Sequence, residues 1–176
     1  MNLIILDNFL PYPNVVRTWA LNQKYYSSKE ISEINNGENT WPGLRTINVN
    51  ELDIGYADMV LSRISYLAQS AFGLNENLSI RSSFQLTKEI DGDSWIHMDN
   101  NVEVAGILYL TPDAPIDAGT TIYTGHPHIA RDIIGNVFNR LVLYKATEFH
   151  KSTKYFGNTN ENSRLTQVFF INQTYN

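Results

Sequence analysis

The sequence predicts an α+β fold, mainly β, with N-terminal helices packed on one face of a jelly-roll-like double sheet. Within the first 77 residues, two stretches carry apolar residues at helical spacing. From residue 78 onward, short runs of β-branched and aromatic residues alternate with turn-forming clusters. We therefore expect one domain over residues 1–176, with a helical support region over 1–77 and a jelly-roll core over 78–176.

The N-terminal region is expected to contain one short strand and two helices. Residues 3–6 are an apolar run that predicts a strand, and residues 14–23 place their apolar side chains on one helical face. The following stretch is rich in Ser, Asn and Gly, which predicts a loop. A second helix is expected over residues 53–72, with Asp53 as its N-cap and Gly73 as its C-cap.

The C-terminal region is expected to be a series of short antiparallel strands. Turn signals rich in Asp, Asn, Gly and Pro separate the candidate strands. The candidate strands cover residues 79–87, 94–99, 103–110, 120–123, 140–144 and 165–171.

Composition narrows the classes of function. The net charge of −5 argues against nucleic acid as the main partner, since binding phosphates requires clustered Lys and Arg. The chain has no cysteine, which removes disulfides and thiolate chemistry and fits a reducing cytosol. No apolar run is long enough to span a bilayer, and the N-terminus lacks the basic start of a signal peptide. We therefore expect a soluble protein of the cytoplasm.

Two histidines and one aspartate form a candidate metal site. His97 and Asp99 are two residues apart, so on an extended segment both side chains point to the same face. His150 follows Asp99 by 51 residues, at the end of an apolar strand pattern. Two imidazoles and one carboxylate can hold non-haem Fe(II) on one face and leave the other face open. The alternative to metal binding is that His97 only ends a strand beside an Asp99 that caps a turn, and that His150 lies on the surface.

Arg164 starts the alternating strand that follows this set, 14 residues after His150. Thr166 shares its face, so both side chains can bind one carboxylate of a dicarboxylic co-substrate. The alternative is that this face is exposed to solvent, or that an internal acid pairs with Arg164.

The order of these motifs resembles the 2-oxoglutarate/Fe(II)-dependent dioxygenases, and in particular their prolyl-4-hydroxylase-like branch. The resemblance rests on His97-Met-Asp99, the strand ending Leu-Tyr109-Leu, the segment 139–150 that ends in His150, and Arg164-Leu-Thr166. The opening Leu-Asp-Asn-Phe-Leu-Pro and the segment Trp-Pro-Gly-Leu-Arg at 41–45 are similar to small bacterial and phage-type members. Such a protein could be phage-encoded and act in the host cytoplasm.

The resemblance implies a double-stranded β-helix with Fe(II) bound by His97, Asp99 and His150. It implies 2-oxoglutarate as co-substrate, O2 as oxidant and ascorbate as a supporting reductant. The co-substrate would be bound by Arg164 and Thr166 at its 5-carboxylate, with help from Tyr109, and near its 1-carboxylate by Gln85 and Thr87. Tyr109 could equally be a core residue, and Gln85 and Thr87 could be ordinary strand residues. The loop over 151–163 is longer than in several prolyl hydroxylases, and is either a lid or a long hairpin.

Several further residues are candidates for contact with substrate: Trp41, Arg45, Trp95 and His126. Both tryptophans have the alternative of packing in the core. His126 and His128 have metal-like spacing, but Gly125 and Pro127 predict a turn, so we expect a loop at the mouth of the site.

The predicted activity is hydroxylation of a peptidyl proline, an amino acid or a small metabolite, with release of CO2 and succinate. Two alternatives remain at the level of sequence. One is a cupin-like metalloenzyme that does not use 2-oxoglutarate, and the other is a non-catalytic jelly-roll binding module. Neither the substrate nor the oligomeric state can be inferred from the sequence.

Overall fold

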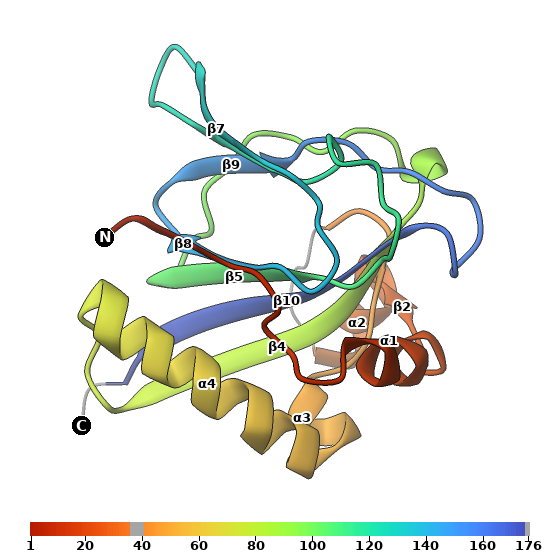
Figure 1. Cartoon of the computed structure of the whole chain (residues 1–176), viewed down its shortest axis with the longest axis horizontal. Helices are drawn as coiled ribbons and strands as arrows, with labels where there is room; N and C mark the ends of the chain where they lie inside the picture. The colour runs from red at the N-terminus through yellow and green to blue at the C-terminus, as the bar shows by residue number, and fades with distance from the viewer. Residues whose placement is uncertain (36–40, 175–176) are drawn as a thin grey trace.

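Two antiparallel sheets face each other in the computed structural model, which describes residues 1–35 and 41–174 (Figure 1). The larger, seven-stranded sheet has the order β1-β8-β5-β10-β4-β3-β2, and the smaller, three-stranded sheet has the order β7-β6-β9. The strands are β1 (Leu3–Leu6), β2 (Tyr26–Ser27), β3 (Leu44–Arg45), β4 (Leu78–Thr87), β5 (Val104–Tyr109), β6 (Thr120–Tyr123), β7 (Ala130–Ile134), β8 (Leu141–Lys145), β9 (Phe149–Ser152) and β10 (Arg164–Gln173). This two-sheet arrangement confirms the predicted jelly-roll core.

Helices α1 (Pro13–Leu21), α3 (Val49–Leu52) and α4 (Ile54–Phe72) cover the outer face of the larger sheet (Figure 1). Helix α2 (Ser28–Asn35) follows β2 at the edge of this sheet, and a short 3-10 turn is formed at Glu89–Asp91. The predicted caps of α4 are confirmed: the Asp53 carboxylate accepts a 2.8 Å hydrogen bond from Tyr56 N, and Gly73 adopts the left-handed conformation with φ 74°. The apolar stripe of α4 then packs against the sheet through Ala57, Val60, Ile64 and Ala68.

Two hydrophobic clusters result from this layering. One lies between the helices and the larger sheet, where Ile64, Phe84 and Leu108 are fully buried. The other lies between the two sheets and includes Ile107, Tyr109 and Ile122. The strand pattern explains both clusters, because successive side chains of β5 point alternately to the helices and to the smaller sheet.

One predicted strand is not formed, and this corrects the expectation for residues 94–99. That segment makes only a single bridge, between His97 and His150. The turn at Asn100 and Asn101, where Asn101 has φ 62°, ends the pairing immediately after Asp99.

The structure also contains elements that the sequence prediction missed. Helix α2 lies inside the expected loop, whose residues 36–40 fall outside the described part of the chain. Helix α2 starts with a capping box: the Glu30 carboxylate accepts a 2.7 Å hydrogen bond from Ser27 N, and Ser27 Oγ accepts a 3.3 Å hydrogen bond from Glu30 N. Strands β2, β3, β7 and β9 were not predicted either, because pairing with neighbouring strands forms them rather than a pattern of their own.

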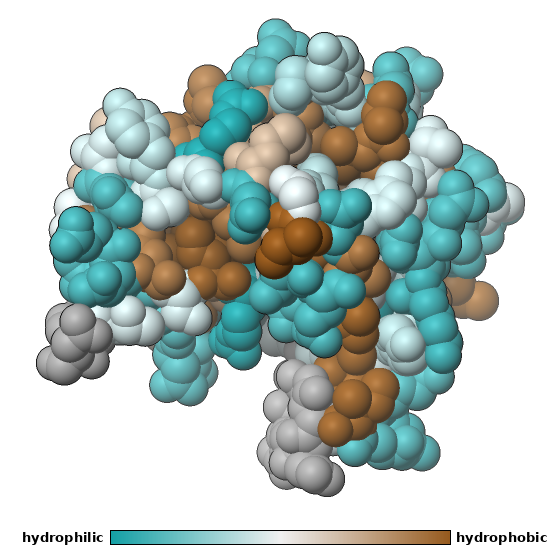
Figure 2. Space-filling model, turned by 90° about the horizontal axis from the view of Figure 1, so that it is seen from below, coloured by the Kyte–Doolittle hydropathy of each residue, from teal (hydrophilic) through white to brown (hydrophobic). Residues whose placement is uncertain are grey.

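The surface viewed from below in Figure 2 shows apolar side chains in separate patches among hydrophilic ones. Exposed apolar residues near this helical layer include Ile54, Met59 and Tyr66 on α4. Within the described residues, no helix has the length and apolar character required to cross a bilayer.

Candidate metal centre

His97 and His150 are brought together by the backbone. His150 lies on β9, and His97 lies on the segment that follows β4. Each backbone N–H donates to the other residue's carbonyl oxygen, at 3.0 Å from His97 and 2.8 Å from His150. The two rings are 4.4 Å apart, centroid to centroid. A reciprocal bridge of this kind places both side chains on the same face.

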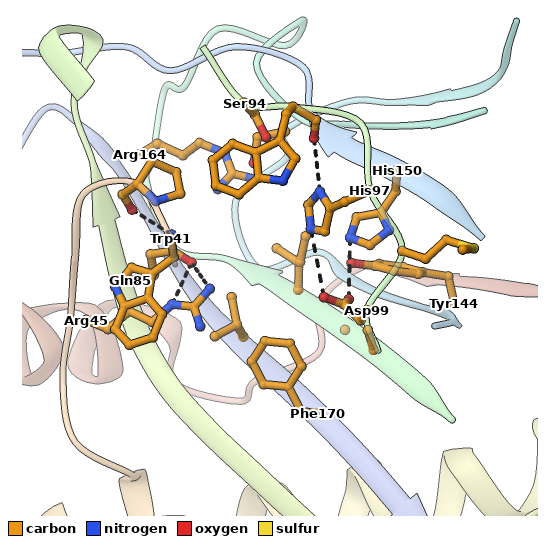
Figure 3. A pocket seen from close by; sticks show the side chains of 18 of the residues that line it. Trp41, Arg45, Gln85, Ser94, His97, Asp99, Tyr144, His150, Arg164 and Phe170 are labelled. Atoms are coloured by element: carbon orange, nitrogen blue, oxygen red, sulfur yellow. Dashed lines mark hydrogen bonds and ion pairs between the residues drawn. The ribbon is translucent and has the colours of Figure 1, made fainter. Parts of the chain in front are cut away.

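The two imidazoles are oriented in the same way by carbonyl oxygens two residues earlier in the chain. Nδ1 of His97 is 2.9 Å from the Trp95 carbonyl oxygen (Figure 3). Nδ1 of His150 is 3.0 Å from the Glu148 carbonyl oxygen. A carbonyl oxygen can only accept, so each Nδ1 carries the proton of the neutral ring. Each Nε2 is then a free lone pair directed into the site, as metal ligation requires.

Asp99 supplies the third donor. Its backbone N–H donates to the Ala146 carbonyl oxygen at 3.0 Å, which ties its segment to the turn before β9. Asp99 Oδ1 is 3.8 Å from His97 Nε2, and Oδ2 is 3.4 Å from His150 Nε2 (Figure 3). Potential ligand atoms of all three residues lie within 4.8 Å of one another. The structure thus brings the predicted triad together.

Burial sets the protonation of the surrounding groups. It lowers the pKa of His150, which favours the neutral ring that binds metals. Burial, reinforced by the nearby Asp99 charge, raises the pKa of Tyr144, whose ring lies 4.6 Å from that of His150. The phenol therefore stays protonated beside the triad.

Arg164 begins β10 and is almost fully buried, with 2% of its surface exposed. Its Nε is 3.4 Å from the Ala118 carbonyl oxygen, while its Nη2 is buried and has no hydrogen-bond partner among the described residues. The hydroxyls of Thr166 and Thr87 are also buried and have no partner in the described part of the chain. Strand register pairs Arg164 with Thr87 on β4, and Thr166 with Gln85 on β4 and Tyr109 on β5. An unpaired cation and two free hydroxyls are therefore grouped on one inner face.

Tyr109 and Gln85 already have partners. The Tyr109 hydroxyl donates to Thr120 Oγ1 at 2.7 Å, and the Tyr109 ring centroid lies 5.5 Å from the Arg164 guanidinium carbon. Burial raises the pKa of Tyr109, so its phenol remains a donor. The Gln85 side-chain oxygen accepts from Arg45. The roles of Tyr109, Gln85 and Thr87 toward a co-substrate stay predictions.

A cavity of about 380 Å³ connects the triad with Arg164. Trp41, Arg45 and Trp95, all predicted to contact substrate, line it. The Trp95 side chain is 49% exposed and its ring lies 5.7 Å from that of His97, so Trp95 stands at the mouth.

His126 does not belong to the described residues that line this cavity. It lies in the exposed loop between β6 and β7, where its ring is 4.2 Å from that of His128 and 5.9 Å from that of Phe149. No cluster of three metal-binding side chains among the described residues includes His126 or His128. The expected turn is therefore present, but His126 is not among the described residues that line the cavity, so its contact with substrate stays a prediction.

Sequence reasoning missed three aromatic residues of the cavity wall, namely Tyr144, Tyr155 and Phe170. Phe170 carried a usable signal, because it continues the alternation of Arg164, Thr166 and Val168 on one face of β10. Tyr155 lies in the irregular segment after β9, where no periodicity indicates which side chain turns inward.

The residues present fit Fe(II) and 2-oxoglutarate. Two neutral imidazoles and one carboxylate form the donor set of non-haem Fe(II) sites, and no thiolate competes. The unpartnered Arg164 Nη2 and the free hydroxyls of Thr87 and Thr166 are donors that a buried carboxylate would satisfy.

No protein-family model matches the sequence, and no curated protein matches it either. Solved structures do match. A prolyl hydroxylase from Trichoplax adhaerens, in complex with a hypoxia inducible factor peptide fragment, has a TM-score of 0.64 and 11% identity, over 98% of this chain and 84% of that one. A Pseudomonas putida prolyl-4-hydroxylase has a TM-score of 0.56 and 15% identity, over 99% and 94%.

A third match is an oxidoreductase of the 2OG-Fe(II) oxygenase family from Burkholderia pseudomallei. Its TM-score is 0.67 at 10% identity, over 98% of this chain and 85% of that one. At such identities the likeness concerns the fold. The chain therefore has the double-stranded β-helix fold that prolyl hydroxylases and 2-oxoglutarate/Fe(II) oxygenases share.

Proposed function

We propose that this protein is an Fe(II)- and 2-oxoglutarate-dependent oxygenase that hydroxylates a small molecule or peptide. The observation that carries the proposal is the buried guanidinium of Arg164, in the same cavity as the His97–Asp99–His150 triad: among the described residues it has no ion-pair partner, and its Nη2 has no hydrogen-bond partner. A buried cation without a counter-charge is costly. A dicarboxylate bound between the metal and Arg164 would supply that counter-charge. A metalloenzyme that does not use 2-oxoglutarate would have no need for the buried Arg164.

Each part of the site has a defined task in this proposal. Bound Fe(II), with 2-oxoglutarate and O2, supplies the oxidation of a C–H bond, and the co-substrate leaves as succinate and CO2. His97, Asp99 and His150 hold the metal on one face. Arg164 and Thr166 bind the far carboxylate, and the Tyr109 ring lies against the guanidinium. Thr87 pairs with Arg164 in the strand register, so we assign its free hydroxyl to this far carboxylate and not to the 1-carboxylate, where the sequence resemblance had put it. Val168, Ile107 and Phe170 line the cavity and reduce its water content.

Two measurements test this function. The purified protein with Fe(II), ascorbate and a substrate panel is expected to convert 2-oxoglutarate into succinate. Under nitrogen, 2-oxoglutarate added to the Fe(II)-loaded protein is expected to produce a weak visible charge-transfer band. Asp99→Ala should abolish both signals, because it removes the anionic metal ligand. Unchanged 2-oxoglutarate decarboxylation in Asp99→Ala would refute the assignment.

A further inference from the structure

A second arginine, Arg45, points into the metal cavity from the edge of the larger sheet. It lies on β3, where the register pairs it with Gln85 of β4. Figure 3 shows Trp41, Arg45 and Gln85 on one side of the cavity and the His97–Asp99–His150 triad on the other. The proposed co-substrate site at Arg164 does not use Arg45.

The guanidinium of Arg45 is held rigidly. Its Nε and Nη2 donate to the side-chain oxygen of Gln85 at 3.1 Å and 3.0 Å, and Gln85 is itself fixed by donating to the Pro42 carbonyl oxygen at 3.0 Å. The Arg45 guanidinium carbon lies 4.6 Å from the Trp41 ring centroid and 5.5 Å from that of Phe170. Such stacking and hydrogen bonding fix the plane of the guanidinium.

The cavity therefore offers donors that no acceptor of the described chain uses. Among the described residues, Nη1 of Arg45 has no hydrogen-bond partner, and Arg45 forms no ion pair. The indole Nε1 of Trp41 is buried and also lacks a partner. Both side chains line the cavity. Two adjacent donors without acceptors indicate a place for an acceptor from the ligand.

The charges in the cavity favour an anion at this place. Its charged lining residues in the described chain are Arg45, Arg164 and Asp99, and the metal adds two positive charges. Arg45, Arg164 and the metal together carry four positive charges. Asp99 and the dianion 2-oxoglutarate carry three negative charges, so one positive charge in the cavity remains without a counter-charge. Burial lowers the pKa of Arg45 to about 10, which still leaves it cationic near neutral pH.

We propose that Arg45 and Trp41 bind a carboxylate of the substrate, so that the substrate is a small organic acid or amino acid rather than an internal residue of a peptide. This inference rests on the proposed function and specifies its substrate class. A planar carboxylate suits a planar guanidinium that is stacked on aromatic rings. A neutral amide would leave the remaining charge of the cavity without compensation.

The test compares binding of acids and their amides without turnover. The probes are the free and N-acetylated L-amino acids, each paired with its carboxamide, and inorganic phosphate as a third arm. Binding to the protein loaded with Fe(II) and 2-oxoglutarate is measured under nitrogen by calorimetry. We expect at least one acid to bind about tenfold or more tightly than its amide, because hydrogen bonds to charged groups are the stronger ones.

Matched variants locate the preference. Arg45→Gln should remove the preference for acid over amide, and Trp41→Phe, which keeps a ring but deletes the N–H, should reduce it. Lys145→Gln removes the same charge from an exposed position at the end of β8 that lines neither the metal cavity nor the adjoining pocket shared by Arg45 and Trp41, and should keep the preference. Two controls separate loss of recognition from loss of folding. Thermal melting shows whether each variant is folded, and Arg45→Lys keeps the positive charge at this position without the planar guanidinium.

Three outcomes would overturn the inference: equal binding of every acid and its amide by the wild type, an acid preference that persists in Arg45→Gln, or a preference for phosphate over every acid. Absence of the 2-oxoglutarate charge-transfer band would instead refute the proposed function. The band in wild type together with equal binding of acids and amides refutes only the substrate class.

Discussion

At the scale of single residues, Arg164 shows how the fold prepares a cation for a ligand. It is 2% exposed, and its Nη2 has no partner within the described chain. Tyr109 and Thr166 flank it through the pairing of β5 with β10. A protein gains no stability from such an arrangement by itself, because the lost hydration is not replaced. The arrangement is useful when a carboxylate binds.

We predict that Arg164→Ala raises the dissociation constant of 2-oxoglutarate about 100-fold, since losing one partner of a buried charge pair costs about 2–5 kcal/mol. Titration of the charge-transfer band under nitrogen measures this constant. Thr166→Val should have a smaller effect, because it removes one neutral donor from the same face. Equal constants for wild type and Arg164→Ala would show that the guanidinium does not bind the co-substrate.

The sequence predicted which residues lie at the site better than it predicted the hydrogen bonds that orient them. The same-face relation of His97 and Asp99 follows from their spacing, and that of Arg164 and Thr166 follows from strand alternation. The hydrogen bonds between Arg45 and Gln85 could not be foreseen. They depend on the pairing of β3 with β4, across 40 residues of chain, and a two-residue strand has no periodicity to reveal it.

At the scale of elements, the connection before β3 places Trp41 and Arg45. Gly43 between them adopts φ +70°, and a Cβ at this position would collide with the Leu86 carbonyl oxygen of β4. A side chain is disfavoured there both by the backbone conformation and by the close approach of the strand. The closeness of β3 to β4 therefore depends on glycine at this position.

We predict that Gly43→Ala lowers the free energy of unfolding by about 1–3 kcal/mol, the range typical of strained backbone positions. It should also weaken the acid preference assigned to Arg45, because the loop must shift. Denaturant unfolding measures the first effect. Gly55→Ala is the matched control: its Cβ would meet only Asp53 Oδ1 at 3.4 Å, so stability should stay within about 0.5 kcal/mol of wild type or rise.

Elements with a strong pattern of their own were predicted with nearly correct bounds. Helix α4 has a continuous apolar stripe and both caps, and β4 and β10 have long alternating patterns. Strand β7 is exposed over most of its length, and β9 has only four residues, so neither carries a clear hydrophobic pattern. Pairing with β6 on either side forms them, and that pairing is a tertiary effect.

At the scale of the whole molecule, the N-terminal 77 residues do more than cover the sheet with helices. They also supply β1, β2 and β3, which lie at the two edges of the larger sheet. At the β1 edge, Arg140 binds the Asp7 carboxylate through Nε at 2.6 Å and Nη2 at 2.9 Å. This ion pair links the end of β1 to the start of β8, 133 residues later in the chain.

The Asp7–Arg140 pair predicts a small acid-dependent contribution to stability. Its hydrogen bonds to Arg140 lower the pKa of Asp7. A carboxyl group whose pKa is lower in the folded state stabilises the protein above its unfolded pKa, and this stability is lost as the pH falls through the folded pKa. Asp7 is 49% exposed, so the contribution at neutral pH is at most about 1 kcal/mol.

Asp7→Asn should therefore be less stable than wild type by up to about 1 kcal/mol near neutral pH, and the two should converge as the pH falls through the lowered pKa of Asp7 in the folded protein. Urea unfolding at a series of pH values measures the difference. Asp113→Asn is a control, since Asp113 forms no ion pair with any described residue. A difference between Asp7→Asn and wild type that stays constant with pH would contradict the assigned role.

The way in which the two histidines are oriented has a consequence for how this protein can change in evolution. Each Nδ1 is held by the main-chain carbonyl oxygen two residues before it, at Trp95 and at Glu148. Almost any amino acid at those positions can present the same oxygen, so the ligands need no partner side chain to be retained alongside them. A centre built in this way tolerates wide divergence of the surrounding sequence. Its geometry is inherited with the course of the backbone, and new substrates can be acquired by replacing the cavity wall alone.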